Sequence, residues 1–354
     1  NFIIDGVTKS KLGEVMNTKT GFKNLIGYNV KGGINYNINE HHNVFGNIGY
    51  YEKQPFFNAV YRSNENVVAK DVKNEKIFGL ELGYGFRSAA FNANVNLYRT
   101  TWDDRYLRRS GLRDIPSGKT FYAEINGLNE VHQGVEVDAS YNLNKLLTIT
   151  GMFSSGDWFY RGNANATLFE DSTNLPFNFP GTSSNETQLY LDKAKVGEAA
   201  QMTAALGLTI TPINNLKFDT NWRSTSNLYA SLDTYNFSVK STADRGTLEL
   251  PNYNLFDLGL SYKIFLNNKQ YFTIRGNVYN LFDTTYISDS NTSTQIKQLS
   301  DFATTTTGGV TTTAQQKYDS YINTPTNFYK GLDSSNQVFF GFGRTWATTL
   351  SFNF

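Results

Sequence analysis

The last stretch of the chain, residues 338–354, alternates between two kinds of side chain. Large apolar residues stand at every second position and include Trp346, Leu350, Phe352 and Phe354, while the positions between them are mostly small or polar. A period of two predicts a β-strand whose two faces meet different surroundings. This strand would exceed the ~5–6 residues usual in soluble proteins, and a tilted strand of about 9–11 residues already crosses a bilayer.

The same alternation recurs along most of the chain and predicts about eleven strands. The expected strands cover residues 22–38, 44–51, 77–86, 91–101, 131–143, 146–153, 200–210, 216–222, 256–264, 272–278 and 338–354.

The connections between these strands alternate between short turns and long polar segments. The short turns lie near residues 39–43, 87–90, 142–145, 211–215 and 266–269. The long loops are expected at residues 53–75, 102–129, 158–197, 224–252 and 282–336. All the long loops therefore fall at one end of the sheet, as in outer-membrane barrels with short periplasmic turns and long extracellular loops. A soluble sandwich is the alternative, but it has no reason to place its long loops at one end.

The composition agrees with a barrel in a membrane. Charged residues make up 18% of the 354 residues, fewer than the roughly 25% of an ordinary soluble protein. Aromatic residues reach 15%, which suits the two aromatic girdles of such a barrel. The fold class predicted is all-β, a transmembrane antiparallel β-barrel. Its walls must be closed, because lipid offers no partner for an unpaired backbone group.

The sequence offers little for an enzyme or a nucleic-acid binder. The net charge of +1 makes no electrostatic case for nucleic acid. There is no Cys, only three His and no Gly-x-Ser-x-Gly elbow, so we expect no catalytic residues, no cofactor and no metal site. Residues 117–120, Ser-Gly-Lys-Thr, resemble the end of a phosphate-binding loop, but Arg113 stands where that motif needs Gly. His41 and His42 are expected in a solvated turn.

Several motifs together resemble the C-terminal half of TonB-dependent outer-membrane receptors. Residues 277–286 read N-V-Y-N-L-F-D-T-T-Y, residues 130–138 read E-V-H-Q-G-V-E-V-D, and residues 343–346 read G-R-T-W ahead of the terminal Phe354. The Asn- and Tyr-rich strands are similar to Bacteroidetes members. The resemblance implies that Phe352 and Phe354 form the signature that closes the barrel.

The resemblance also implies a whole receptor with a 22-stranded barrel and an N-terminal plug. Residues 1–354 would be the C-terminal part of that barrel, with the plug and the first strands outside this chain, and residues 1–20 would end a loop or an earlier strand. The C-terminus would lie on the periplasmic side of the bacterial outer membrane and the long loops outside.

The implied function is uptake of a scarce ligand, which could be a siderophore, haem, a vitamin, a glycan or a peptide. The implied partners are the TonB complex, the plug, membrane lipid and lipopolysaccharide, and a surface lipoprotein. The alternatives are a self-contained passive channel or outer-membrane enzyme, and a barrel that scaffolds partner lipoproteins.

The expected loop at residues 102–113 is the main candidate for ligand binding. Arginine forks bind carboxylates and phosphates, and aromatic rings stack on planar or sugar ligands. The candidates are Trp102, Arg105, Tyr106, Arg108, Arg109 and Arg113, with Phe56, Phe57, Tyr61, Trp158 and Tyr160 as secondary candidates. The alternative is an ordered loop whose arginines pair with Asp103 and Asp104 or touch lipopolysaccharide phosphates.

A second set of charged residues shares the parity of the polar face and is expected to line the lumen. Its members are Glu81, His132, Glu136, Asp138, Asp219, Arg223 and Arg275. Charges of both signs suit a lumen filled by a plug or by water better than an apolar pocket.

Overall fold

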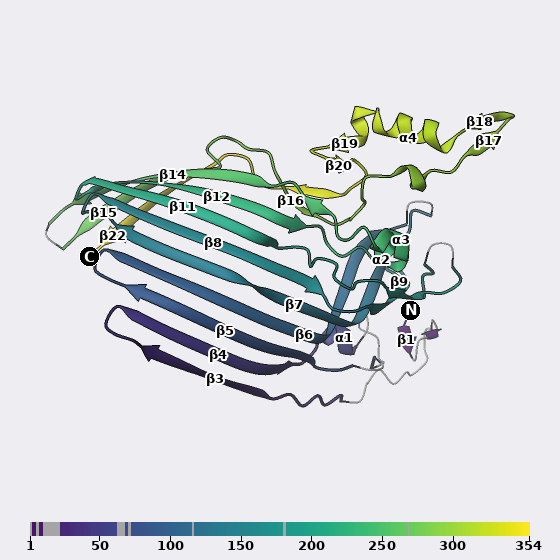
Figure 1. The fold of residues 1–354 in the computed structure, drawn as a ribbon, viewed down its shortest axis with the longest axis horizontal. Helices are drawn as coiled ribbons and strands as arrows, with labels where there is room; N and C mark the ends of the chain where they lie inside the picture. Colours follow the sequence, from purple (N-terminus) through teal and green to yellow (C-terminus); the bar gives the residue numbers. More distant parts are fainter. Residues whose placement is uncertain are drawn as a thin grey trace.

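One large antiparallel sheet dominates the computed structural model (Figure 1). The structure describes residues 2–4, 7–9, 22–61, 68–69, 72–114, 117–179, 182–267 and 269–354, so most of the unassigned segment 1–20 lies outside the described residues. Within this described part, eleven strands pair in sequence order, and each hydrogen-bonds to its neighbours along the chain. They are β3 (Asn29–Asn37), β4 (His42–Lys53), β5 (Glu75–Arg87), β6 (Phe91–Arg113), β7 (Thr120–Asn142), β8 (Leu147–Tyr160), β11 (Ala200–Ile213), β12 (Leu216–Tyr229), β14 (Tyr253–Phe265), β15 (Tyr271–Tyr279) and β22 (Thr345–Asn353).

The sheet is a curved wall whose two outer strands are β3 and β22. The predicted antiparallel order and the number of strands are therefore confirmed. The wall is part of a barrel. The short connections gather at the end of the wall where the chain terminates, and the long ones at the other end, as predicted (Figure 1). No helix among the described residues is long and apolar enough to span a membrane.

The long connections are folded rather than irregular. They contain β9 (Ala164–Glu170), β10 (Glu186–Leu189), β13 (Glu249–Leu250), β16 (Ile287–Ser290), β17 (Thr305–Thr307), β18 (Val310–Thr312), β19 (Phe328–Tyr329), β20 (Leu332–Asp333), β21 (Val338–Phe340), α1 (Phe57–Val60), α2 (Thr234–Ser238), α3 (Lys240–Ala243) and α4 (Ala314–Ile322). Near the N-terminus, β1 (Phe2–Ile4) pairs with β2 (Val7–Lys9).

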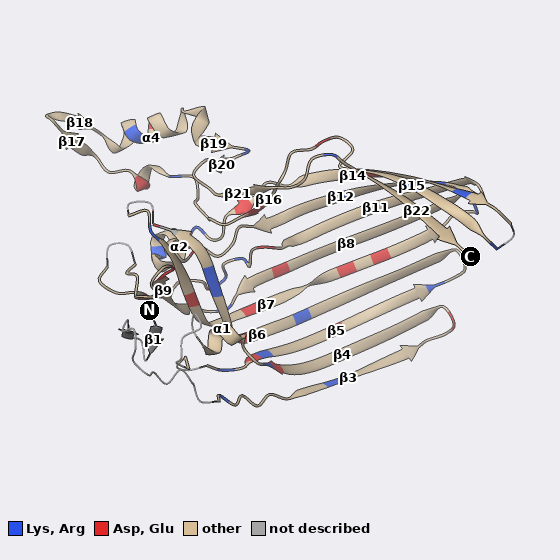
Figure 2. Cartoon of the chain, turned by 180° about the vertical axis from the view of Figure 1, so that it is seen from behind, with Lys and Arg blue, Asp and Glu red and all other residues tan. Residues whose placement is uncertain are grey.

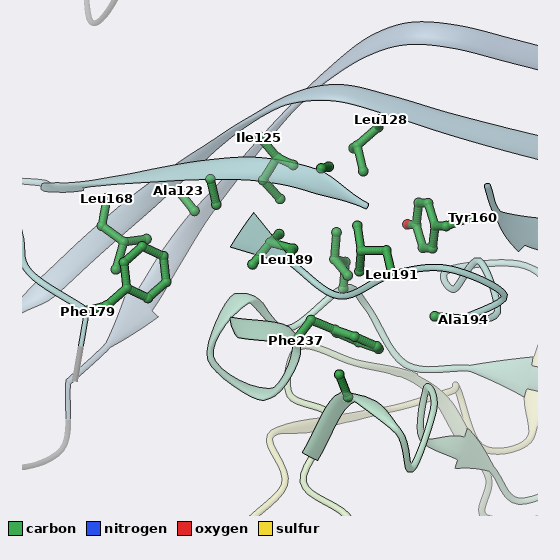
Figure 3. Packing of buried hydrophobic residues seen from close by; sticks show 14 of the residues in the cluster. Ala123, Ile125, Leu128, Tyr160, Leu168, Phe179, Leu189, Leu191, Ala194 and Phe237 are labelled. Atoms are coloured by element: carbon green, nitrogen blue, oxygen red, sulfur yellow. The ribbon is translucent and has the colours of Figure 1, made fainter. Parts of the chain in front are cut away.

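A buried hydrophobic cluster organises the loop end of the wall (Figure 3). Phe121, Ile125 and Leu128 of β7 pack in this cluster with Leu168 of β9 and Phe237 of α2. Each of these side chains is almost fully buried. The loop end therefore has a core of its own, which holds the ends of β6 and β7 nearest the long connections in place.

Several predicted boundaries are wrong: β3 begins at Asn29 rather than at residue 22, β7 begins at Thr120 rather than at residue 131, and β12 continues to Tyr229. Residues 102–113 are not a loop, because β6 continues through them and pairs with the first half of β7, with register shifts at three points. The last stretch is not one strand, because β21 pairs with β16 while β22 pairs with β15. The break lies at Gly341, where the ring of Tyr286 occupies the space that a Cβ would need.

The two faces of the wall differ as the alternation predicts. The apolar set is exposed, with Leu82 at 54%, Leu206 at 52% and Leu260 at 44% of their possible accessible area. The alternate positions carry polar groups that pair with one another, and Figure 2 shows only scattered charges along the strands. An apolar face that no protein atoms cover suits the hydrocarbon of a bilayer.

A charge placed on the apolar face should destabilise the protein more than the same charge on the polar face. Val95 lies midway along the apolar stretch of β6, and the adjacent Asn96 faces inward opposite Glu136 in β7. We expect Val95→Arg to lower the free energy of unfolding by about 2–4 kcal/mol, and Asn96→Arg by less than about 1 kcal/mol. Urea unfolding of the receptor in lipid vesicles measures both, and equal losses would contradict this assignment of the faces.

Candidate functional site

A small pocket forms at the loop end of the wall, and we call it the rim pocket. It has a volume of about 200 Å³ and is lined by Lys53, Phe56, Asn58, Glu75, Arg105, Tyr106, Leu107 and Arg108. The segment around α1 supplies one side and the extension of β6 supplies the other. The structure thus brings together Phe56, Arg105, Tyr106 and Arg108, which the sequence placed in two separate candidate loops.

The charges of the rim pocket are held in fixed positions. Lys53 Nζ lies 3.0 Å from the buried Glu75 carboxylate and 4.5 Å from the centre of the Phe56 ring. The Arg108 guanidinium lies over the Tyr122 ring at 3.8 Å. Cations held over aromatic faces lose little freedom when they bind a ligand, so the pocket is suited to a small acidic group.

Arg105 connects the rim pocket to the inner face through Glu130. Its Nη1 atom donates to both carboxylate oxygens of Glu130, at 2.7 and 2.8 Å, and His132 Nε2 lies 3.1 Å from the same carboxylate. Burial alone raises the pKa of Glu130, but the hydrogen bond with His132 and the charge of Arg105 outweigh it and hold the pKa below its ordinary value. The ion pair therefore stabilises the fold at pH values above the ordinary pKa of a Glu side chain. This contribution is lost as the pH falls through the lowered pKa of Glu130.

Below the rim pocket, the inner face has a larger cavity of about 910 Å³, which we call the inner hollow. Its lining includes Tyr51, Tyr98, Trp102, Trp158, Glu81 and Glu136, together with His132. His132 stacks on Trp158, with ring centres 5.2 Å apart, and Trp158 Nε1 donates to the Tyr98 hydroxyl at 2.9 Å.

Glycines in the wall make room for these rings. A Cβ at Gly49 would lie 2.6 Å from the Tyr51 ring, and one at Gly134 would lie 2.7 Å from the Tyr98 hydroxyl. Aromatic side chains can therefore lie against the glycine backbone, where no side chain occupies the space. The alternation of Gly with larger residues in β4 and β5 provides such positions.

The remaining ligand candidates are not in the rim pocket. Arg109 pairs with Glu198, and Tyr160 is 4% exposed inside the loop-end core. Phe57 and Tyr61 contact each other, with ring centres 4.9 Å apart. The side chain of Arg113 lies outside the described residues.

The expected pairing of the arginines with Asp103 and Asp104 is wrong for Arg105 and Arg109. Arg161 pairs with Asp103, and Lys76 Nζ lies 3.0 Å from Asp104. The register of β6 against β7 places Glu130 next to Arg105 instead.

The predicted lumen residues lie on the polar face, and most of them have polar partners. Arg275 donates to both oxygens of Asp219 at 2.8 and 2.7 Å, and Arg223 to Asp257 at 2.8 Å. The amides of Asn47 and Asn94 donate to Glu81 and Asp138, each at 3.0 Å. These residues form an inner surface crossed by ion pairs and amide hydrogen bonds.

The weaker motifs have ordinary structural roles. Ser117 N donates to Asp114 Oδ2 at 3.0 Å in the turn between β6 and β7, and Thr120 begins a strand where a phosphate-binding loop needs a helix. His41 Nδ1 bonds to a backbone oxygen and His42 Nδ1 to the Tyr84 hydroxyl. In the described part of the chain, no three His, Asp or Glu side chains are placed to hold a metal ion.

Sequence reasoning missed Lys53, Glu75 and Glu130 as members of the site. Glu75 and Lys53 are register partners in β4 and β5, and Glu130 is the register partner of Trp102. For Lys53 and Glu75, the signal that would have found them is an acidic residue at the start of one strand aligned with a basic residue at the end of its neighbour. Glu130 lies within β7 and has no such signal.

Comparison with known families identifies the class of protein. The family model "TonB dependent receptor-like, beta-barrel" matches residues 17–281. The chain therefore belongs to this family, whose members are outer-membrane β-barrel receptors and transporters rather than enzymes. The resemblance inferred from the sequence motifs is confirmed. A comparison with curated proteins found no match.

Solved structures share the fold at low sequence identity. The copper transporter OprC is 14% identical with a TM-score of 0.55, and the alignment covers 91% of this chain and 39% of that one. The siderophore receptor PiuA from Acinetobacter baumannii is 14% identical with a TM-score of 0.53, covering 92% and 35%. The ferric preacinetobactin receptor BauA from the same organism is 13% identical with a TM-score of 0.51, covering 92% and 36%. The chain thus spans well under half the length of these structures.

Removal of Arg105 should destabilise the protein, because it leaves the buried Glu130 carboxylate without its main partner. We expect Arg105→Ala to lower the free energy of unfolding by about 3–5 kcal/mol. The control is Arg161→Ala, which breaks a half-exposed pair with Asp103 and should change stability by about 1 kcal/mol or less. Thermal unfolding of the detergent-solubilised receptor compares the two, and a similar small loss for both would show that the Glu130 pair contributes little.

Proposed function

We propose that this chain forms the C-terminal part of the barrel of a receptor that imports a scarce ligand across the outer membrane with energy from the TonB complex. The observation that supports it most is the contrast between the two faces of the same strands. The outer face is apolar and exposed, whereas the inner face carries paired charges and the inner hollow. Such a wall separates lipid from a polar passage, and the family to which the chain belongs supports an uptake role.

The arrangement also supports a direction of transport. In this proposal the loop end faces the outside and the short turns face the periplasm, with the C-terminus beside them. The ligand meets the rim pocket first and the inner hollow second. The plug of the whole receptor, in a barrel of 22 strands, would close the passage until the TonB complex acts. Lipopolysaccharide and a surface lipoprotein would be the neighbours of the loop end.

The names of the structural neighbours support import as the activity. One is called a copper transporter, one a siderophore receptor and one a ferric preacinetobactin receptor. Each of those descriptions applies to its own protein, and the ligand of this chain follows from its own pockets.

Deletion of the gene should reduce growth on one limiting nutrient, and deletion of tonB in the parent strain should reproduce that defect. The measurement is growth across defined iron and carbon sources, followed by uptake of the labelled nutrient. A passive channel would transport the same nutrient without TonB, so uptake that persists in the tonB deletion would contradict the proposal.

Loss of the Arg108 charge should weaken uptake of a ligand that carries an acidic group. Arg108→Gln keeps much of the side chain over Tyr122 but removes one charge from the rim pocket, and a charge-assisted hydrogen bond is worth about 1.5–3 kcal/mol. We expect ligand binding to weaken about tenfold, as read from the half-saturation concentration for uptake.

The matched variant is Arg109→Gln, which changes the neighbouring residue and breaks its pair with Glu198 outside the rim pocket. It should leave the half-saturation concentration unchanged. Equal effects of the two variants, at equal amounts of receptor in the membrane, would remove the rim pocket from the binding site.

A further inference from the structure

A row of polar side chains crosses the apolar outer face near the loop end. Arg99 of β6, Gln133 of β7 and Asp157 of β8 are register partners. Leu97 and Val135 pair two positions nearer the short turns and face outward, and residues two apart in a strand share a face. The three polar side chains therefore face outward as well, and we call them the outer polar row.

Hydrogen bonds and an ion pair join this row to a second cation. Arg99 Nη1 donates to Gln133 Oε1, and Gln133 Nε2 donates to Asp157 Oδ2 at 3.2 Å. Lys195, which bridges to the end of β8, has its Nζ atom 2.5 Å from Asp157 Oδ1. Two cations therefore share one carboxylate, which leaves one positive charge in excess. Arg99 is exposed, and within the described residues its guanidinium bonds only to Gln133, so it can still donate to an anion.

The outer polar row lies at the edge of the expected hydrocarbon layer. Arg99 stands eight positions after Phe91, which begins β6 at the turn end of the apolar face. This separation is about 26 Å along the strand and about 20 Å in depth at a tilt of about 40°, within the roughly 25 Å of a usual apolar band. Phe78 and Phe159, one pair nearer the loop end, face outward beyond the row. A charge that faces lipid at this depth is costly unless it has a partner.

A second set of charged groups lies farther toward the loop end. Lys76 is the register partner of Glu52 and Asp103, and Arg161 pairs with Asp103. Asp103 is four positions beyond Arg99, which is about 13 Å along the strand and about 10 Å in depth. The polar layer of ordinary phospholipids is only about 5–8 Å thick on each side and would end below this second set. A lipid that carries a phosphate at its acyl chains and sugars beyond the phosphate would reach both sets.

We infer that the outer polar row binds the phosphate of a glycolipid in the outer leaflet, as found in lipopolysaccharide. This inference rests on the proposed function, which places the loop end outside the cell, and it adds the residues that hold the lipid. The guanidinium of Arg99 suits a phosphate, because its fork can donate to two oxygens. The acyl chains would lie along Leu97 and Val135, and the sugars would meet Lys76 and Arg161.

The test measures lipid binding to the purified full-length receptor in detergent by native mass spectrometry. The probe is monophosphoryl lipid A, and the comparison probes are the same lipid without its phosphate and phosphatidylglycerol. We expect monophosphoryl lipid A to bind at least tenfold more tightly than either comparison probe, a difference of about 1.4 kcal/mol or more.

Three variants separate charge recognition from general damage. Arg99→Gln should weaken binding of monophosphoryl lipid A about tenfold, whereas Asp157→Asn should strengthen it severalfold, because a negative charge beside the phosphate is removed. The matched control is Arg223→Gln, which removes an arginine charge from the inner face, where it pairs with Asp257, and should leave binding unchanged. The shift of each receptor on heating in detergent gels shows that its barrel is folded.

A photoreactive amino acid in place of Ser155, the outward partner of Val135, tests the occupant in cells. Crosslinking to lipopolysaccharide is expected, and crosslinking to a protein alone would overturn the inference. Absence of lipid A binding, equal binding of either comparison probe, or equal binding by folded Arg99→Gln would also overturn it. The proposed function fails separately, because uptake that does not need TonB contradicts energy coupling even when lipid A binds. Uptake that needs TonB, with no lipid A bound, leaves import standing and removes the lipid site.

Discussion

The structure depends on the requirement that backbone groups inside a membrane bond to one another, because lipid supplies no partner. Antiparallel pairing of consecutive strands meets this requirement with the shortest connections. From β3 to β22 the order of the strands in the sheet follows their order in the sequence, apart from the small strands of the loop end. Each short turn therefore needs only to reverse the chain, while the long connections are free to build pockets.

Pairing in register also places alternate side chains of every strand on the apolar outer face or the polar inner face. Leu82 faces outward with Leu97 and Val135, its partners across β6 and β7, and Gly83 shares the inner face with Asn96 and Glu136. Glycine appears on the inner face where a neighbouring ring covers the backbone, as at Gly49 beneath Tyr51. The same spacing that keeps the outer face apolar thus leaves space inside for flat rings and a cavity.

The sequence was sufficient to predict the wall because lipid enforces a strict period of two. It failed in residues 102–113, where register shifts near Trp102, Arg105 and Arg109 interrupt the alternation. It failed again at Gly341, where β21 and β22 are separate and the ring of Tyr286, a residue far away in the sequence, lies against the glycine. The candidate aromatic and arginine residues were found by type, but Lys53 and Glu75 needed the pairing of β4 with β5.

Glu130 shows why the two pockets should be considered together. Its buried carboxylate bonds on one side to Arg105, which lines the rim pocket, and on the other to His132, which lines the inner hollow. A buried carboxylate needs such partners, because an unpaired charge in the interior is strongly destabilising. His132 in turn stacks on Trp158, whose indole N–H holds Tyr98. One continuous series of contacts thus connects the rim pocket with the aromatic rings of the inner hollow.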